Sequence, residues 1–155
     1  MKTQFMRAAI RLARDRMRHG EGGPFGAVIV RRDRIVGRGW NRVTSTNDPT
    51  AHAEVTAIRD ACRRLKTFRL EDCEIYASCE PCPMCLAAIY WARIGRIFHA
   101  GTRRDAAAAG FDDDLIRREM ARPVSRRKIP TRQLLRVDAL KVFKEWGEKP
   151  DKIRY

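Results

Sequence analysis

Long apolar stretches are absent from this 155-residue chain. No segment reaches the length that crosses a membrane, and residues 1–7 lead into a charged amphipathic pattern where a secretory signal would have an uncharged apolar core. The five cysteines are odd in number, which argues against a closed disulfide framework and fits a reducing compartment. We therefore expect a cytoplasmic protein with no membrane partner.

Acidic residues are also scarce: 19 aspartates and glutamates face 33 lysines and arginines, and the formal net charge is +14. A strongly basic surface can attract RNA. The cations are spread along the whole chain, however, and aromatic residues do not alternate with them. This distribution favours a solvated surface, and nucleic-acid binding is the less favoured interpretation of the charge.

Neither a repeat nor a low-complexity linker divides the chain, and its hydrophobic content of 44% can fill one core. We therefore predict a single domain over residues 1–155. Periodicity and turn residues predict a helix over 3–18, a hairpin of strands over 26–30 and 35–40, a helix over 51–65 and a strand over 73–78. They then predict a helix over 82–92, a strand over 96–100 and a short helix near 115–121. The last predicted elements are a weak fifth strand over 134–137 and a helix near 139–146. A helix links the third and fourth strands, which makes them parallel. The prediction is an α/β fold with a mixed five-stranded sheet and helices on both faces.

Three thiols and two prolines are concentrated within residues 79–85 (CEPCPMC). Proline is tolerated in the first turn of a helix, where its missing N–H has no partner to lose, so Pro81 and Pro83 predict a helix start. Cys82 and Cys85 then lie on one face near the positive end of that helix, which favours the thiolate form. The pair is typical of half a zinc site.

The other half of the site is predicted within residues 48–54 (DPTAHAE), where Pro49 ends an irregular stretch and a second helix begins. His52 supplies a third ligand, and one imidazole with two thiolates leaves the fourth tetrahedral position for water, as in catalytic zinc sites. Glu54 points in a different direction from His52 and is predicted to be the general acid and base. Cys79 ends a predicted strand and is the less favoured ligand.

Two residues at the ends of the predicted hairpin are candidates for contacts with a flat heterocycle. Phe25 begins the first strand, and its ring could stack on such a ligand, although a place in the core is the alternative. Asn41 follows the second strand and offers a donor and an acceptor, as the edge of a base requires; the alternative is a turn residue.

The pattern H-x-E at residues 52–54, followed by P-C-x-x-C at residues 81–85, is the known signature of zinc-dependent nucleobase deaminases. With this signature the chain resembles the cytidine deaminase superfamily, and within it looks most like the guanine deaminases. The resemblance is carried by residues 22–30 (GGPFGAVIV), 47–59 (NDPTAHAEVTAIR), 78–93 (SCEPCPMCLAAIYWAR) and 105–113 (DAAAAGFDD), and it extends to Tyr155. It implies a three-layer α/β/α fold with one zinc ion per chain.

The same resemblance implies a reaction and a set of roles. Guanine would be hydrolysed to xanthine and ammonia, with Glu54 carrying the proton. Asn41 would hold the purine edge, and Phe25 and Trp91 would flank the ring. Asp113 would assist ring recognition or proton transfer, although it could also belong to an acidic cluster that opens the next helix.

The C-terminal tail, about residues 147–155, reads by composition as a frayed terminus. Gly147 and Pro150 give it a flexible start and a bend, and Tyr155 ends it with an aromatic ring. The resemblance implies that this tail closes over the zinc pocket, with Tyr155 contacting the substrate. The pocket could belong to the same chain or to a partner subunit in a homodimer with exchanged C-terminal segments.

Two alternatives to a guanine deaminase stay open. A tRNA-specific adenosine deaminase would use the same zinc chemistry and is favoured by the net charge, but residues 112–114 (DDD) would repel a phosphate backbone. A zinc-stabilised RNA-binding module without catalysis would need a fourth protein ligand and would leave Glu54 without a role.

Overall fold

The computed structural model describes residues 2–154. The chain divides into two compact units, Met1–Asp113 and Asp114–Tyr155. The single domain expected over residues 1–155 therefore stays a prediction.

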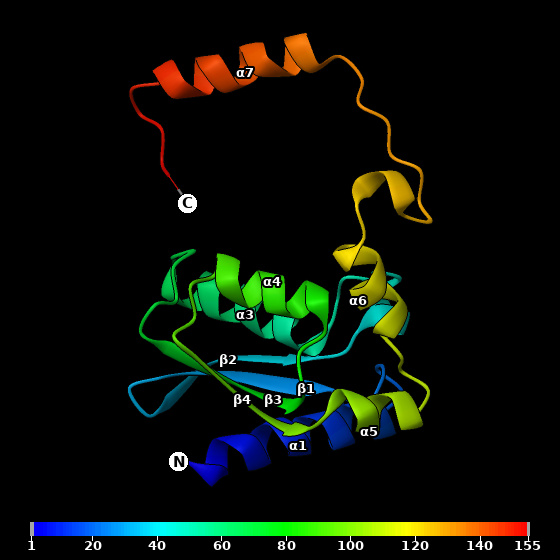
Figure 1. Cartoon of the computed structure of the whole chain (residues 1–155). Helices are drawn as coiled ribbons and strands as arrows, with labels where there is room; N and C mark the ends of the chain where they lie inside the picture. Colours follow the sequence, from blue (N-terminus) through cyan, green and yellow to red (C-terminus); the bar gives the residue numbers. More distant parts are fainter. Residues whose placement is uncertain (1, 155) are drawn as a thin grey trace. The chain divides into compact units, whose positions relative to one another are not determined.

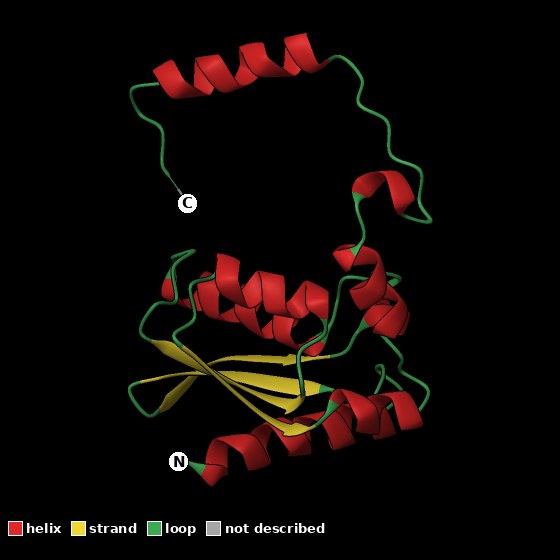
Figure 2. Ribbon diagram, in the orientation of Figure 1, coloured by secondary structure: helices red, strands yellow, loops and turns green. Residues whose placement is uncertain are grey.

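A four-stranded mixed sheet forms the centre of the first unit (Figure 2). Its strands are β1 (Gly26–Arg31), β2 (Arg34–Trp40), β3 (Cys73–Cys79) and β4 (Arg96–Gly101), in the order β2-β1-β3-β4. β1 runs antiparallel to β2 and β3, and β3 runs parallel to β4, as the helix between them predicted. The α/β prediction with a mixed sheet is confirmed.

The predicted fifth strand over residues 134–137 is wrong. Residues 132–135 are irregular, and helix α7 (Arg136–Glu148) begins immediately after them. Leu135 adopts a left-handed conformation with φ 51°, which a strand does not accommodate. The short apolar run at this point belongs to the start of the helix.

Helices cover both faces of the sheet in the first unit. Figure 1 shows α1 (Thr3–Arg18) on one face and α3 (Ala53–Leu65) with α4 (Pro83–Trp91) on the other. Phe5 and Ala9 of α1 pack with Val28 and Tyr76 of the sheet. The face of α1 that carries Arg7, Arg11, Arg14 and Arg18 is exposed, as its periodicity predicted.

Small residues bring α3 into backbone contact with β2. A Cβ atom added to Gly39 would lie 2.1 Å from the carbonyl oxygen of Ala53 and 2.3 Å from the main-chain nitrogen of Ala57. Real side-chain carbons do not approach backbone atoms so closely, so this packing requires glycine on the strand. The contact holds the first turn of α3 against the sheet, immediately after His52.

Several short helices escaped the sequence analysis. They are α2 (Val43–Thr46), α5 (Arg103–Ala108) and the 3-10 helix η1 (Val124–Arg126). α5 begins with a capping box in which Thr102 and Asp105 exchange hydrogen bonds. α6 (Asp114–Ala121) and α7 (Arg136–Glu148) agree with the helices predicted near 115–121 and 139–146.

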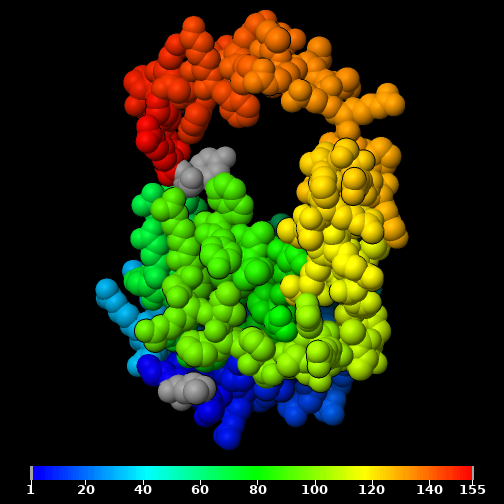
Figure 3. Space-filling view, viewed as in Figure 1, coloured from blue at the N-terminus to red at the C-terminus, as the bar shows by residue number. Residues whose placement is uncertain are grey.

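The second unit has no buried residue among those that the structure describes in α6, η1 and α7. Figure 3 draws the side chains of this unit in yellow, orange and red. The exposed large apolar side chains of this unit are Leu115, Ile116, Met120, Val124, Ile129, Leu134, Leu135, Val137, Leu140, Val142, Phe143, Trp146 and Ile153. Within residues 2–154, no helix is both long and apolar enough to span a membrane.

Candidate metal centre and active site

Two helix starts supply the three predicted zinc ligands. His52 is the N-cap of α3, with an extended backbone at φ −69° and ψ 159°, and Cys82 is the N-cap of α4, at φ −66° and ψ 168°. The sequence placed His52 within the first turn of its helix; the structure places it one residue before the helix. Pro83 then takes the first helical position, where proline is favoured, and Cys85 follows two residues later.

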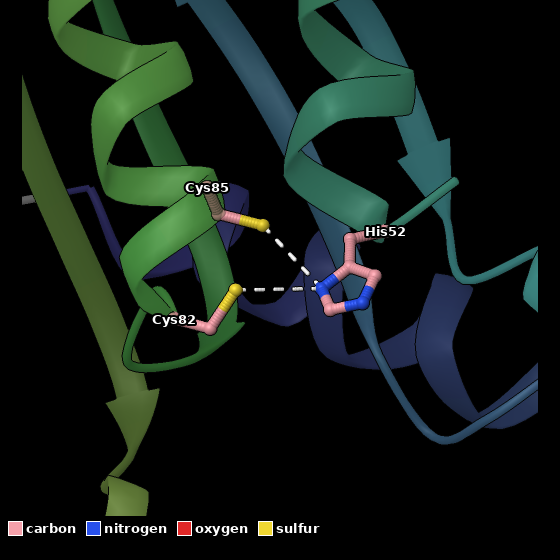
Figure 4. Close-up of side chains that lie close together, drawn as sticks. All are labelled: His52, Cys82 and Cys85. Atoms are coloured by element: carbon pink, nitrogen blue, oxygen red, sulfur yellow. Dashed lines mark hydrogen bonds between the residues drawn. The ribbon is translucent and has the colours of Figure 1, made fainter. Parts of the chain in front are cut away.

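The ligand atoms of these residues converge (Figure 4). The Nδ1 atom of His52 lies 3.5 Å from Sγ of Cys82 and 3.5 Å from Sγ of Cys85. A tetrahedral zinc ion with usual Zn–N and Zn–S bond lengths would hold such atoms about 3.6 Å apart. The donor set therefore fits zinc, and these three residues are positioned to hold one ion.

The two thiols differ in the direction of their pKa shifts. The Cys85 thiol donates to Cys82, which lowers the pKa of Cys82 to about 4 and raises the pKa of Cys85. The hydrogen bond to Cys82 is also the main reason that the pKa of His52 is raised. Two adjacent thiolates repel each other, so the pair keeps a proton until a divalent ion replaces it.

Glu54 lies on the first turn of α3, outside the ligand set. Its side chain is buried, with an exposed fraction of 7%. Burial disfavours the charged carboxylate and raises the pKa of Glu54. A buried carboxyl with a raised pKa next to a metal site is suited to accept and return a proton near neutral pH.

Cys79 takes another partner. Its thiol donates to the carbonyl oxygen of Thr102 over 3.4 Å, and it is not among the three convergent ligands. Cys73 is buried, and Cys62 is partly buried and packs against the core. The separation of ligand from non-ligand cysteines agrees with the sequence analysis.

Phe25, which precedes β1, and Asn41, which follows β2, lie together around Gly23. A Cβ atom added to Gly23 would lie 3.5 Å from Phe25, 3.6 Å from Asn41 and 3.5 Å from Phe111. The rings of Phe25 and Phe111 meet edge to face, with centroids 4.9 Å apart. The main-chain N–H of Arg42 donates to the carbonyl oxygen of Ala51 over 2.9 Å, which joins this group to the residue before His52.

Phe111 was not singled out by the sequence analysis, although it lies within the segment 105–113 that carries the resemblance. The signal was the neighbouring Gly110, whose φ of +91° turns the chain. The contact between Phe111 and Phe25 attaches this segment to the group around Gly23. Asp113 follows two residues later and is partly exposed.

The remaining predicted site residues are Trp91 and Tyr155. Trp91 ends α4, nine residues after Cys82, or roughly 13 Å further along a helix axis. Its side chain is largely exposed. Tyr155 lies outside the residues that the structure describes.

The amino-acid sequence of the first unit matches a known family. The cytidine and deoxycytidylate deaminase zinc-binding region matches residues 1–100. The chain belongs to this family. The matched region contains the three convergent N and S donors and the buried carboxyl group of Glu54.

Two relatives differ in how much of the chain they cover. A guanine deaminase of Bacillus subtilis is 50% identical over 151 residues, which is 97% of this chain and 97% of that protein. A tRNA-specific adenosine deaminase of Aquifex aeolicus is 45% identical over 96 residues, which is 62% of this chain and 63% of that protein. Similarity to the guanine deaminase therefore continues beyond the region that tRNA deaminases share.

The solved structures agree. The X-ray structure of the Bacillus subtilis guanine deaminase superposes with a TM-score of 0.97 at 49% identity, over 100% of this chain and 99% of that chain. A tRNA:A34 deaminase structure superposes with a TM-score of 0.62 at 42% identity, over 65% of this chain and 72% of that chain.

Proposed function

We propose that this protein is a zinc-dependent guanine deaminase that converts guanine and water to xanthine and ammonia. The observation that carries the proposal is the tetrahedral donor set of His52, Cys82 and Cys85 beside the buried Glu54. Similarity to the Bacillus subtilis guanine deaminase over nearly the whole chain supports the choice of substrate.

The chemistry divides between the metal and one carboxylate. Zinc held by the three ligands lowers the pKa of a water molecule from about 15.7 to about 7 and so makes it a nucleophile near neutral pH. Glu54 would accept one proton from this water and deliver it to the ring nitrogen as the water oxygen bonds to C2. It would then carry the remaining hydroxyl proton to the 2-amino group, which leaves as ammonia when the C2–N bond breaks. General acid and base catalysis of this kind contributes about 10²–10⁴-fold to the rate.

The substrate is held by residues on two sides of this centre. Phe25, supported edge to face by Phe111, stacks on the purine ring. Asn41 contacts the purine edge. Asp113 assists ring recognition or proton transfer, and the contact of Phe111 with Phe25 supports its place at the site.

The C-terminal part of the chain forms the contact between the two subunits of a homodimer. The apolar side chains Leu140, Phe143 and Trp146 recur along α7 with helical spacing and are exposed in the single chain. An apolar helix face of this kind is stabilised by burial against a partner. In the dimer the C-terminal segments are exchanged, so that the tail over about residues 147–155 covers the partner's site and Tyr155 contacts the substrate there. Trp91 flanks the purine ring together with Phe25. The protein works in the cytoplasm.

One assay tests the proposed reaction. Zinc-loaded protein is incubated separately with guanine, adenine, cytosine and transfer RNA, and ammonia is measured in each. Ammonia is expected from guanine, with xanthine as the second product. Inosine formed in transfer RNA, with no ammonia from guanine, would instead support the adenosine deaminase alternative, which the net charge of +14 favours.

A second experiment tests the exchange of C-terminal segments. Deletion of Asp151–Tyr155 is expected to leave zinc content and the folded state nearly unchanged while sharply lowering guanine turnover. Mixing and refolding the truncated protein with a full-length Glu54→Gln protein is expected to restore part of the activity, because an intact tail then covers an intact site. No recovery indicates closure within one chain. Full activity of the truncated protein alone contradicts the role of the tail.

A further inference from the structure

Helix α1 carries a line of exposed arginines. Four of them recur at steps of four, three and four residues: Arg7, Arg11, Arg14 and Arg18. These steps keep the side chains within a narrow arc of a helix with about 3.6 residues per turn, and at a rise of about 1.5 Å per residue the line is roughly 16 Å long. Asp15 is the one acidic residue within α1.

Three of these four guanidinium groups lack a carboxylate partner in the part of the chain that the structure describes. The exception is Arg14, whose Nε atom lies 3.1 Å from a carboxylate oxygen of Asp15. Among residues 2–154, no ion pair involves Arg7, Arg11 or Arg18. The positive charge of these three side chains is therefore not neutralised by the described chain.

The arginines of helix α3, on the opposite face of the sheet, differ in this respect (Figure 1). Arg59 lies 3.5 Å from a carboxylate oxygen of Asp48. Arg63 and Arg64 lie 2.6 Å and 2.9 Å from the two carboxylate oxygens of Asp60. Along the sequence the cations are evenly spread, but in the structure those of α3 face carboxylates and those of the α1 line do not.

Such a line of cations fits a partner with regularly spaced negative charges. A nucleic-acid double helix carries a phosphate about every 3.4 Å of its axis on each strand, so a segment as long as the line offers several phosphates. Guanidinium groups bind phosphate oxygens with paired hydrogen bonds. Surfaces that bind single strands add aromatic side chains on which the bases stack. Phe5, the one aromatic residue of α1, is buried, so the surface suits a duplex, whose bases are already stacked.

An acidic membrane is the less favoured partner of this helix. Helices that bind at a membrane surface bury an apolar face among the lipid headgroups. The apolar face of α1 is already used, because Phe5, Ala9 and Ala13 are buried. Phe5 and Ala9 pack with Val28 and Tyr76 of the sheet. Only the cationic face of α1 remains for a partner.

We propose that Arg7, Arg11 and Arg18 form a surface that binds the phosphate backbone of double-stranded nucleic acid. Contacts to phosphates carry no sequence information directly, so binding is independent of base sequence. The zinc ligands lie at the starts of α3 and α4, on the other face of the sheet. Binding at α1 is therefore an activity separate from guanine deamination, and each can be tested without the other.

The experiment measures the salt dependence of binding. Fluorescence anisotropy gives the affinity of the zinc-loaded protein for a duplex of DNA and for a duplex of RNA, between about 50 and 200 mM salt. A triple variant replaces Arg7, Arg11 and Arg18 by Gln, which has a similar helix propensity. Each phosphate contact contributes about 0.9 to the slope of log affinity against log salt concentration, so the triple variant is expected to reduce this slope by about 2–3.

A matched control replaces Arg59, Arg63 and Arg64 of α3 by Gln. It removes the same number of charges, but these already face carboxylates, so the slope is expected to change by less than about 1. Substitution of the three α1 arginines by Lys keeps the charge and is expected to keep most of the slope. Zinc content and guanine turnover are expected to stay unchanged in the α1 variants. If the triple variant does not fold, single substitutions replace it, each with an expected reduction of about 1.

Equal reductions of the slope by the α1 and α3 variants would overturn the inference, because net charge alone predicts that outcome. Absence of binding to both duplexes at about 50 mM salt would also overturn it. So would binding to phosphatidylserine vesicles that depends on the α1 arginines, without binding to either duplex. Binding to one duplex alone supports the surface and identifies the nucleic acid that it accepts. Ammonia release from guanine tests the proposed function separately, whatever the duplex measurements give.

Discussion

The two units of this chain differ in how far their apolar side chains are buried. The first unit buries Leu70, Ile75 and Ile89 in a core between the sheet and its helices. The second unit exposes its aromatic and aliphatic side chains, including Phe143 at 69% of its accessible surface. The comparison teaches that the three zinc ligands lie in a unit with a buried core, whereas α6 and α7 contain no buried residue among those that the structure describes.

The largest effect expected in the first unit is loss of zinc. Cys85→Ser is expected to release the ion and to lower the unfolding temperature, because zinc bound by thiolate and imidazole ligands stabilises small zinc-bound folds by about 10–16 kcal/mol. Metal analysis and thermal unfolding measure both. Cys79→Ser is the matched control, since its thiol donates to Thr102, and it should retain zinc. The opposite pattern would show that the ligand set is wrong.

Next in size is the loss of catalysis without loss of structure. Glu54→Gln is expected to lower guanine turnover by about 10²–10⁴-fold, because the amide cannot carry a proton. Zinc content and thermal unfolding should match those of the unmodified protein. Retention of more than a tenth of the original turnover would remove Glu54 from its assigned role.

Alanine substitutions at two glycines, one in each unit, test how closely the surrounding atoms are packed. Gly39→Ala introduces a carbon 2.1 Å from the backbone of α3 and is expected to destabilise the first unit by about 1–3 kcal/mol or more. Gly147→Ala, in α7, meets no atom within 4 Å and is expected to change stability by less than about 1 kcal/mol, in the stabilising direction. Chemical denaturation measures both. Strong destabilisation by Gly147→Ala would mean that this part of α7 packs closely against a partner.

The smallest effect on activity is expected at Asp113. Asp113→Ala is expected to lower kcat/KM for guanine by an amount equivalent to about 1–3 kcal/mol, because it removes a hydrogen-bond partner of the substrate. Asp112→Ala is the adjacent control and should change kcat/KM little. Equal small effects of both substitutions would favour the alternative of an acidic cluster at the start of α6.

Local sequence signals predicted most of the first unit. The prolines around Cys82 and the spacing of the thiols placed a helix start and two ligands, because those constraints act within one turn. The same reasoning failed for residues 134–137, because a short apolar run is compatible with a strand or with a helix. In the structure Leu135 has a left-handed backbone conformation and helix α7 begins at the next residue. It also missed α5, whose alanines carry no apolar stripe.

By itself the sequence determined the zinc donor set of His52, Cys82 and Cys85 and the places of the four strands along the chain. These follow from residue type and short-range spacing, which act through helix starts and strand periodicity. Only the tertiary structure decided that His52 comes within 3.5 Å of Cys82, 30 residues away. It also decided that Phe111 contacts Phe25 and that the amide oxygen of Asn41 accepts a hydrogen bond from the main-chain N–H of Gly23. Those features depend on contacts between distant segments, and no local pattern in the chain specifies which donors will meet which acceptors.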